Sequence, residues 1–303
     1  MRDWKAFARG VAVGACPGTA IGLLAFFFLT SSQHKGMGAV LFLLVPIVSG
    51  FSIALVASAD TTTTAALLTV LCSLVMLVAL GKEGPLCTVL AFPIIAAGLG
   101  IGMALGWLVR RLVRGHASNQ TTTIGILLLI PPLAVFVGER FERPVFERAR
   151  TEVISDAVRV NSSPEHVWQE IQSIDSIQAK KPALMYVGLP IPQRCTMRGS
   201  GIGARRTCYF NVGYIEERVI AWNPPYLMGL AIDRTHMPGR HWLGFEHAEY
   251  RLQRQGNATI LTRTTTITSH LHPAWYWRGF ERLGVESEHR YILQDVVLRA
   301  NSP

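Results

Sequence analysis

Charged residues are scarce in this sequence. They make up only 16% of the 303 residues, and the mean hydropathy is +0.29, whereas a typical soluble domain carries about 25% charged residues. The deficit lies in the first half: residues 1–150 contain 12 Lys/Arg and 6 Asp/Glu, against 17 and 14 in residues 151–303. An ordinary soluble domain is therefore excluded for the first half, which we expect to be a membrane region, and is expected for the second half.

Recognised catalytic, metal-binding and nucleic-acid-binding motifs are also missing. No C-x-x-C pair or His/Cys cluster suggests a metal site, and the five cysteines suggest no disulfide framework. No Ser-His-Asp order, phosphate-binding loop or dinucleotide fingerprint is visible. The net charge of +9 comes largely from residues beside apolar segments, which indicates lipid headgroups as partners. We expect no cofactor, no metal and no nucleic-acid partner.

Long apolar runs predict an all-α transmembrane region over residues 1–138. A helix needs about 20 mainly apolar residues to span a bilayer. The small-residue run 96–102, with Gly98 and Gly102 four residues apart, suits close helix packing, either within the chain or in a homo-oligomer. About five helices are expected, at residues 11–30, 37–57, 62–81, 86–109 and 122–138.

Basic residues flanking these helices do not decide the orientation. With the N-terminus in the cytoplasm, six basic residues lie on the cytoplasmic side: Arg2, Lys5, Arg9, Arg110, Arg111 and Arg114. The opposite orientation also places six there: Lys35, Lys82, Arg140, Arg143, Arg148 and Arg150. The first helix often dominates, which favours a cytoplasmic N-terminus and, with five crossings, a second half outside the cytoplasm. The side of the second half stays open.

Residues 139–150 are rich in arginine and predict a basic juxtamembrane linker. Beyond it, residues 151–303 predict a globular domain with a strand, a helix, several antiparallel strands and a long final helix. That order is typical of an α+β fold in which a curved sheet grips a helix. The expected strands are 151–160, 204–210, 215–221, 226–232, 245–253 and 258–269, and residues 175–198 are expected to be irregular. The first strand alternates around Val153, Ile154, Val158 and Val160. The final helix is expected to have an apolar stripe made of Trp275, Tyr276, Phe280, Leu283, Ile292, Leu293, Val296 and Val297.

The stretch 199–225 predicts a β-hairpin whose inner face carries two opposite charges. Alternation places Ala204, Arg206, Cys208 and Phe210 on one face of the first strand, and Ile215, Glu217, Val219 and Ala221 on one face of the second. Arg206 and Glu217 on an otherwise apolar face indicate either a buried ion pair or the polar end of a ligand cavity.

Several motifs in the second half resemble a known superfamily. They are V-x-V-N-S-S-P-E-x-V-W, then G-x-G-A-R-R-x-C-x-F-x-x-G-x-I-x-E, then W-x-P-P, then T-x-L-T-R-T-T, then P-A-W-Y-W-R, and finally a last helix bearing a histidine. In this order they resemble the polyketide cyclase/dehydrase and lipid-transport (START-like, SRPBCC, helix-grip) superfamily, and in particular its membrane-attached bacterial members, whose Glu-Gly-x-x-Cys segment is matched at residues 83–87. The resemblance implies a multi-pass protein of the bacterial inner membrane, with a cavity between the sheet and the last helix for a hydrophobic ligand. It implies no particular activity.

Candidate ligand-binding residues are Arg206, Cys208, Phe210, Glu217, Trp222 and His289. His289 and Glu217 are also candidate catalytic groups, and Cys208 is either a core residue or a nucleophile activated by Arg206. The expected function is membrane-anchored binding of a lipid or other hydrophobic small molecule, as a carrier or sensor. The alternatives are a cyclase or dehydratase acting on a hydrophobic substrate, and a structural or interaction module with a filled cavity. The sequence does not decide whether the protein is an enzyme, and it names neither the ligand nor the process.

Overall fold

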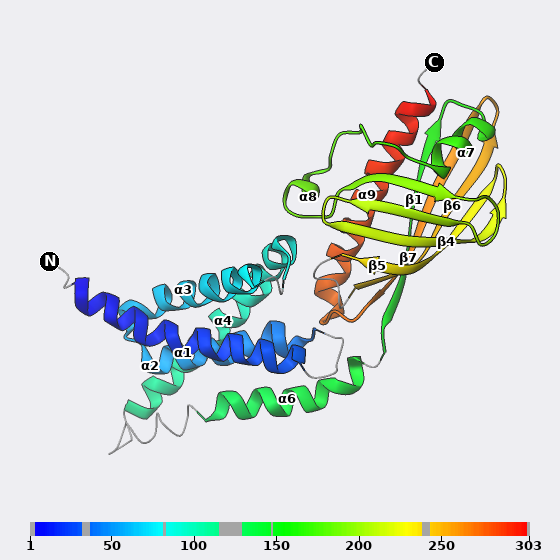
Figure 1. Ribbon diagram of the computed structural model, residues 1–303. Helices are drawn as coiled ribbons and strands as arrows, with labels where there is room; N and C mark the ends of the chain where they lie inside the picture. The colour runs from blue at the N-terminus through cyan, green and yellow to red at the C-terminus, as the bar shows by residue number, and fades with distance from the viewer. Residues whose placement is uncertain are drawn as a thin grey trace. The chain divides into compact units, whose positions relative to one another are not determined.

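The computed structural model shows two compact units (Figure 1). It describes residues 4–31, 37–80, 83–114, 129–146, 148–237 and 243–301. One unit comprises Met1–Arg148 and the short segment His270–Pro273, and the other comprises Ala149–Ser269 and Ala274–Pro303.

The described residues of the first unit are mainly helical, as predicted from its apolar composition. Three of its described helices are long and apolar enough to cross a membrane: Trp4–Leu29, Ala59–Ala79 and Pro85–Leu112. A fourth apolar helix, Val40–Val56, is shorter. Residue 81 and the expected helical residues 122–128 lie outside the described residues, as do Arg2, Lys35 and Lys82. The helices are α1 (Trp4–Ser31), the π-helix η1 (Val40–Leu44), α2 (Val45–Val56), α3 (Ala59–Ala79), α4 (Pro85–Arg114) and α6 (Ile130–Phe146).

Glycines let α2 and α4 approach each other closely. A Cβ on Gly50 would lie 2.2 Å from the carbonyl oxygen of Leu99, and a Cβ on Gly102 would lie 1.9 Å from that of Ile47. A Cβ on Gly98 would likewise lie 3.0 Å from the Cβ of Pro46. Of the two uses expected for the small-residue run, packing within the chain is therefore the one that the structure shows.

The expected linker 139–150 is mostly helical. Helix α6 continues to Phe146, and the following strand begins at Arg150. One ion pair supports the extra helical turns, and one hydrogen bond ties them to η1. Arg143 pairs with Glu139 one turn earlier at 3.0 Å, and the Glu142 carboxylate accepts the backbone N–H of Val40 at 3.0 Å, at the start of η1.

The second unit is a seven-stranded antiparallel sheet with a long C-terminal helix along it (Figure 1). The strand order is β1-β7-β6-β5-β4-β3-β2, so β1 and β2 form the two edges. This is the predicted helix-grip arrangement. The strands are β1 (Arg150–Val160), β2 (Pro192–Arg198), β3 (Arg205–Phe210), β4 (Gly213–Asn223), β5 (Leu227–His236), β6 (Leu243–Gln255) and β7 (Ala258–Ser269), and the helices are α7 (Pro164–Gln172), α8 (Ala183–Tyr186) and α9 (Ala274–Ala300).

Strand β2 and the short helix α8 correct the prediction that residues 175–198 are irregular. Proline breakers dominate that stretch, but Pro192 occupies the first position of β2, where the lack of an N–H is tolerated. The predicted start of α7 is confirmed: Ser163 caps the helix by accepting the backbone N–H of His166 at 3.4 Å.

The apolar residues of β1 and of the predicted stripe on α9 are not all buried. Val153 is 66% exposed, because the even-numbered residues of β1, including Ile154 and Asp156, are the ones that turn inward. On α9, Trp275 is 75% exposed and Leu283 is 44% exposed. The buried side of α9 instead follows Glu281, Val285, His289, Ile292 and Val296. Glu281 and His289, two of these five residues, are polar. A search for apolar residues at helical spacing therefore does not find this side of the helix.

The main core of the second unit lies between the sheet and the helices α7 and α9. Its buried members come from seven elements, namely β1, α7, β4, β5, β6, β7 and α9, so it depends on the whole fold. They include Val160, Val167, Ile171, Val219, Met228, Leu230, Leu261, Leu293 and Val296.

Candidate functional site

Arg206 and Glu217 form a buried ion pair on the inner face of the β3–β4 hairpin, as the alternation predicted. The two residues are directly opposite in the strand register, and Arg206 Nη1 donates to Glu217 Oε2 at 3.0 Å. Arg206 is 2% exposed and Glu217 is 7% exposed. Burial lowers the pKa of the Arg206 guanidinium, but the charge of Glu217 and the nearby Tyr250 outweigh burial, so its pKa lies above the ordinary value. Arg206 therefore keeps its positive charge in the fold.

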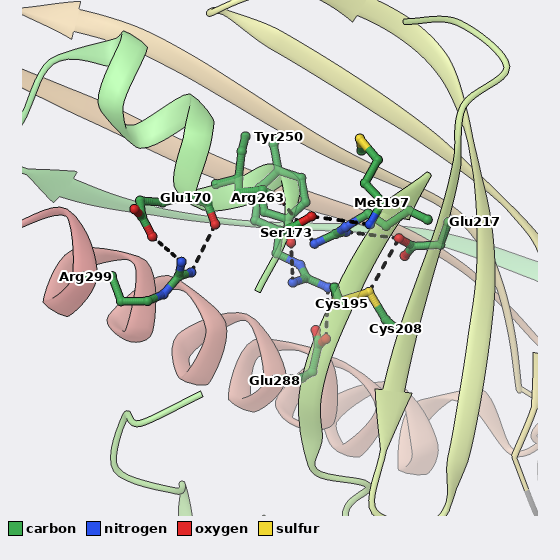
Figure 2. Close-up of a disulfide and its surroundings, with 12 residues drawn as sticks. Glu170, Ser173, Cys195, Met197, Cys208, Glu217, Tyr250, Arg263, Glu288 and Arg299 are labelled. Carbon is green, nitrogen blue, oxygen red and sulfur yellow. Dashed lines mark hydrogen bonds and ion pairs between the residues drawn. A yellow bond between two sulfur atoms is a disulfide. The ribbon is translucent and has the colours of Figure 1, made fainter. Parts of the chain in front are cut away.

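A second buried guanidinium extends this polar cluster (Figure 2). Arg263 of β7 donates to the hydroxyl of Tyr250 at 2.7 Å and to Glu288 of α9 at 2.9 Å. The Arg206 and Arg263 guanidinium carbons lie 5.6 and 5.2 Å from the centre of the Tyr250 ring. Two guanidinium groups and two carboxylates thus balance inside the domain, with one tyrosine ring beside both cations.

Cys208 is joined to Cys195 by a disulfide between β3 and β2 (Figure 2). This corrects the expectation that the cysteines form no disulfide, and it removes the alternative that Cys208 is a free nucleophile in this state. The prediction missed the bond because β2 was not recognised, so the register that places Cys195 opposite Cys208 could not be seen. The Cys208 sulfur lies 3.7 Å from Glu217 Oε2, so the disulfide adjoins the ion pair.

His289 is fully buried on α9, and both of its ring nitrogens have partners. Nδ1 lies 2.7 Å from Asp156 Oδ2, and Nε2 lies 2.7 Å from the Thr265 hydroxyl. The carboxylate favours the protonated ring, but burial and the charge of Arg263 outweigh it and lower the pKa of His289 to about 2. The neutral ring donates from Nδ1 to Asp156 and accepts the Thr265 hydroxyl at Nε2. This environment therefore disfavours a role for His289 as a proton donor near neutral pH.

The other two candidate ligand-binding residues pack into hydrophobic clusters. Trp222 lies against Trp168, with ring centroids 4.9 Å apart, and belongs to the margin of the main core. Phe210 packs on a smaller cluster that contains the disulfide and Ile292.

A pocket of about 420 Å³ opens at the β2 edge of the domain. Its walls come from the segment after α7, the start of β2, the β3–β4 turn and one residue of α9. The lining residues are Asp175, Ser176, Ile177, Lys181, Ile191, Pro192, Gln193, Arg194, Asn211 and Tyr291. None of the six candidate ligand-binding residues is among them, so their role in binding a ligand stays a prediction.

The charges in this pocket are not matched by neighbouring ion pairs. Within the described residues, neither Lys181 nor Asp175 forms a salt bridge, and the Arg194 guanidinium lies over the ring of Tyr209 at 4.4 Å instead of on a carboxylate. Burial and the charge of Asp295 raise the pKa of Tyr291, so this phenol keeps its proton. The pocket thus offers two cations, one carboxylate and a phenol beside the apolar side chains of Ile177, Ile191 and Pro192.

Sequence reasoning missed the pocket residues and the partners of the buried charges. Asp156 and Tyr250 lie in none of the motifs, and the T-x-L-T-R-T-T motif contains Arg263 but indicates no partner for it. Only the fold brings these residues and Glu288 to Arg206 and His289. Among the described residues, no group of three or more His, Cys, Asp or Glu side chains could hold a metal ion.

Comparison with known proteins gives structural likeness alone. No protein-family model and no curated protein matches the sequence. The ZhuI aromatase/cyclase from a Streptomyces species is 15% identical, with a TM-score of 0.36, over 50% of this chain and 94% of that chain. The di-domain aromatase/cyclase BexL is 14% identical, with a TM-score of 0.37, over 58% of this chain and 61% of that chain. Norcoclaurine synthase from Thalictrum flavum is 13% identical, with a TM-score of 0.32, over 51% of this chain and 91% of that chain. Such values carry no argument about function.

Proposed function

We propose that this protein binds a hydrophobic small molecule with an acidic end in its helix-grip domain, and that its apolar helices attach the domain to a membrane. The observation that carries the proposal is the pocket at the β2 edge. Its volume of about 420 Å³ falls within the range of about 300–1,000 Å³ that is typical of small-molecule sites.

The lining of the pocket supports this class of ligand. Ile177, Ile191 and Pro192 offer apolar surface to the body of the molecule. Lys181 and Arg194 outnumber Asp175, and neither cation is neutralised by a salt bridge within the described residues, so an acidic end group is favoured over a basic one. A fatty acid or a similar amphiphilic acid has this chemistry.

Membrane attachment is the second part of the proposal. Three described helices have the length and hydropathy to cross a bilayer. A multi-pass protein of the inner membrane would keep its binding domain close to a source of apolar molecules that dissolve poorly in water. A carrier or a sensor would both gain from this arrangement.

The observations do not favour the cyclase or dehydratase hypothesis. Its proposed acid-base residue, His289, is fully buried with both nitrogens bonded. Its second proposed group, Glu217, is held by Arg206. We therefore propose binding without chemistry as the function.

The test is mass spectrometry of small molecules extracted from the purified full-length chain. We expect an amphiphilic acid at close to one molecule per chain. The K181E variant should lose most of it, because the reversed charge repels the acidic end group. We expect binding to weaken about fivefold, which corresponds to about 1 kcal/mol. K180E is the matched control, since Lys180 is an exposed neighbour that does not line the pocket. A wild-type chain with no bound molecule, or equal loss in both variants, would overturn the proposal.

A further inference from the structure

Cys195 joins three segments of the domain. Its backbone pairs with Ile174, with N···O distances of 2.8 and 2.7 Å in the two directions. Its side chain forms the disulfide with Cys208. Cys195 itself belongs to β2, which is an edge strand and pairs only with β3 in the sheet. The single residue therefore ties the segment after α7 to the β2–β3 pair.

The pocket walls are the direct continuations of these three segments. Residues 175–177 follow Ile174, residues 191–194 precede Cys195, and Asn211 stands three positions after Cys208. Asn211 also holds the wall at Ile191, whose backbone N–H donates to Asn211 Oδ1 at 2.8 Å. The disulfide is thus a covalent cross-link that lies within a few residues of most of the pocket lining along the chain.

Without the disulfide, the β2 wall would depend on weak restraints. The strand is short, and its pairing with β3 is irregular between Pro192 and Arg194, where it lines the pocket. On its outer side β2 has few hydrogen bonds among the described residues: the backbone pair of Cys195 with Ile174, and the Met197 N–H that donates to Ser173 Oγ at 3.3 Å. Local opening of β2 would therefore be easier than opening of β7 or α9.

We propose that the Cys195–Cys208 disulfide fixes the pocket wall, so that the domain holds its ligand only in the oxidised state. This rests on the proposed function. Formation of the bond joins the two sulfur atoms and transfers two electrons and two protons to a protein disulfide of a thiol oxidase, which becomes a dithiol. Reduction by a dithiol reverses the exchange and releases the wall.

The same bond places the domain outside the cytoplasm. Structural disulfides persist in oxidising compartments and are rare in the cytosol. The basic residues flanking the helices leave the orientation open, at six against six. The disulfide favours the orientation with the N-terminus in the cytoplasm, an odd number of membrane crossings, and the helix-grip domain on the opposite side.

The first test counts free thiols in cells. Cells that make the full-length chain are quenched with acid, and the denatured protein is alkylated with a maleimide polymer before or after reduction. With five cysteines, of which Cys195 and Cys208 form the disulfide, we expect three additions before reduction and five after it. Five additions in both samples would overturn the proposal.

The second test measures ligand binding in each redox state. The full-length chain in lipid nanodiscs is irradiated with a photoreactive palmitic acid, with and without a phosphine reductant, and the labelled chain is quantified. We expect reduction to lower labelling about tenfold, because the binding-competent fraction falls. The C195V/C208V variant should label weakly in both conditions, and C72V is the matched control because Cys72 is a free cysteine of α3.

The outcomes separate the two proposals. No labelling of the oxidised wild type would overturn the proposed function and this inference together. Equal labelling of oxidised and reduced chains would overturn the inference alone. Hydrogen exchange then tests whether reduction opens the pocket wall or unfolds the whole domain. The inference predicts that reduction speeds exchange in residues 174–177 and 191–197 and leaves β7 and α9 unchanged. Faster exchange throughout the domain, or in none of it, contradicts it.

Discussion

Arg206 and Arg263 are charged side chains buried inside the helix-grip domain, so burying them costs much free energy. Each has a carboxylate partner, yet the Nε atom of each has no hydrogen-bond partner among the described residues. Taking such charges out of water costs several kcal/mol per ion, and excellent pairing is needed to offset it. Arg206 and Glu217 were predictable because a hairpin fixes its own register. Arg263 and Glu288 were not, because nothing local in the sequence relates β7 to α9.

We expect the Arg206–Glu217 pair to stabilise the fold mainly by cancelling two buried charges. Replacing Arg206 alone (R206M) leaves Glu217 unpaired and should lower the free energy of unfolding by about 3–5 kcal/mol. The double variant R206M/E217L should be less destabilised than R206M. Urea unfolding of the full-length chain, followed by tryptophan fluorescence, measures this, with R205M as the control on an exposed neighbour. Equal stability of R206M and R205M would contradict the assignment.

His289 should make the domain sensitive to acid. Its pKa is lowered to about 2 in the fold and is about 6.5 in the unfolded chain. Between these values the unfolded chain binds one more proton, so stability is fully present above about pH 6.5 and falls as the pH is lowered, by up to about 1.4 kcal/mol per unit. Burial raises the pKa of the neighbouring Asp156, which offsets part of this loss.

The measurement is urea unfolding of the full-length chain at several pH values between about 7 and 4. We expect H289Q to show a shallower loss of stability on acidification than the wild type, because the titrating ring is gone. H247Q is the control, since His247 is exposed on β6. Parallel pH curves for H289Q and the wild type would show that His289 does not titrate between the two states.

At the scale of elements, the sequence predicted those whose pattern is local. The hairpin β3–β4 and the strand β7 followed from alternation, and α7 followed from its cap. Strand β2 did not, because Pro192 and the polar residues after it hide an edge strand that is defined by its pairing with β3. The inner side of α9 was misplaced for a similar reason, since Glu281 and His289 are buried by partners on other elements.

The close contact between α2 and α4 gives a prediction at this scale. In G102V the new side chain would meet the backbone of Ile47, since even a Cβ would lie 1.9 Å from its carbonyl oxygen. The two helices must then separate, and we expect the detergent-solubilised chain to aggregate at a lower temperature. G100A is the control: no atom lies within 4 Å of a Cβ there, and alanine favours a helix over glycine by about 0.5–1 kcal/mol. A heat-aggregation assay that finds G102V as stable as G100A would refute this packing.

At the scale of the whole molecule, composition alone separated the two units. The contrast in charge between residues 1–150 and 151–303 predicted a helical apolar unit and a globular α+β unit, and the structure contains both. The position of the pocket could not be predicted, because its walls come from four segments that meet only in the folded domain. The sequence placed the ligand among the hairpin residues, whereas the pocket lies at the β2 edge.

The most direct measurement is the site at which a photoreactive palmitic acid attaches to the full-length chain in lipid nanodiscs, located by peptide mass spectrometry. If the pocket at the β2 edge binds the ligand, labelled peptides should carry residues 175–181, residues 191–194 or Tyr291. The S176W variant, which fills the pocket, should lose this label, and S200W, an exposed serine outside the pocket, should keep it. Labelling confined to the apolar helices α1, α3 and α4, or pocket labelling that S176W leaves unchanged, would contradict the account.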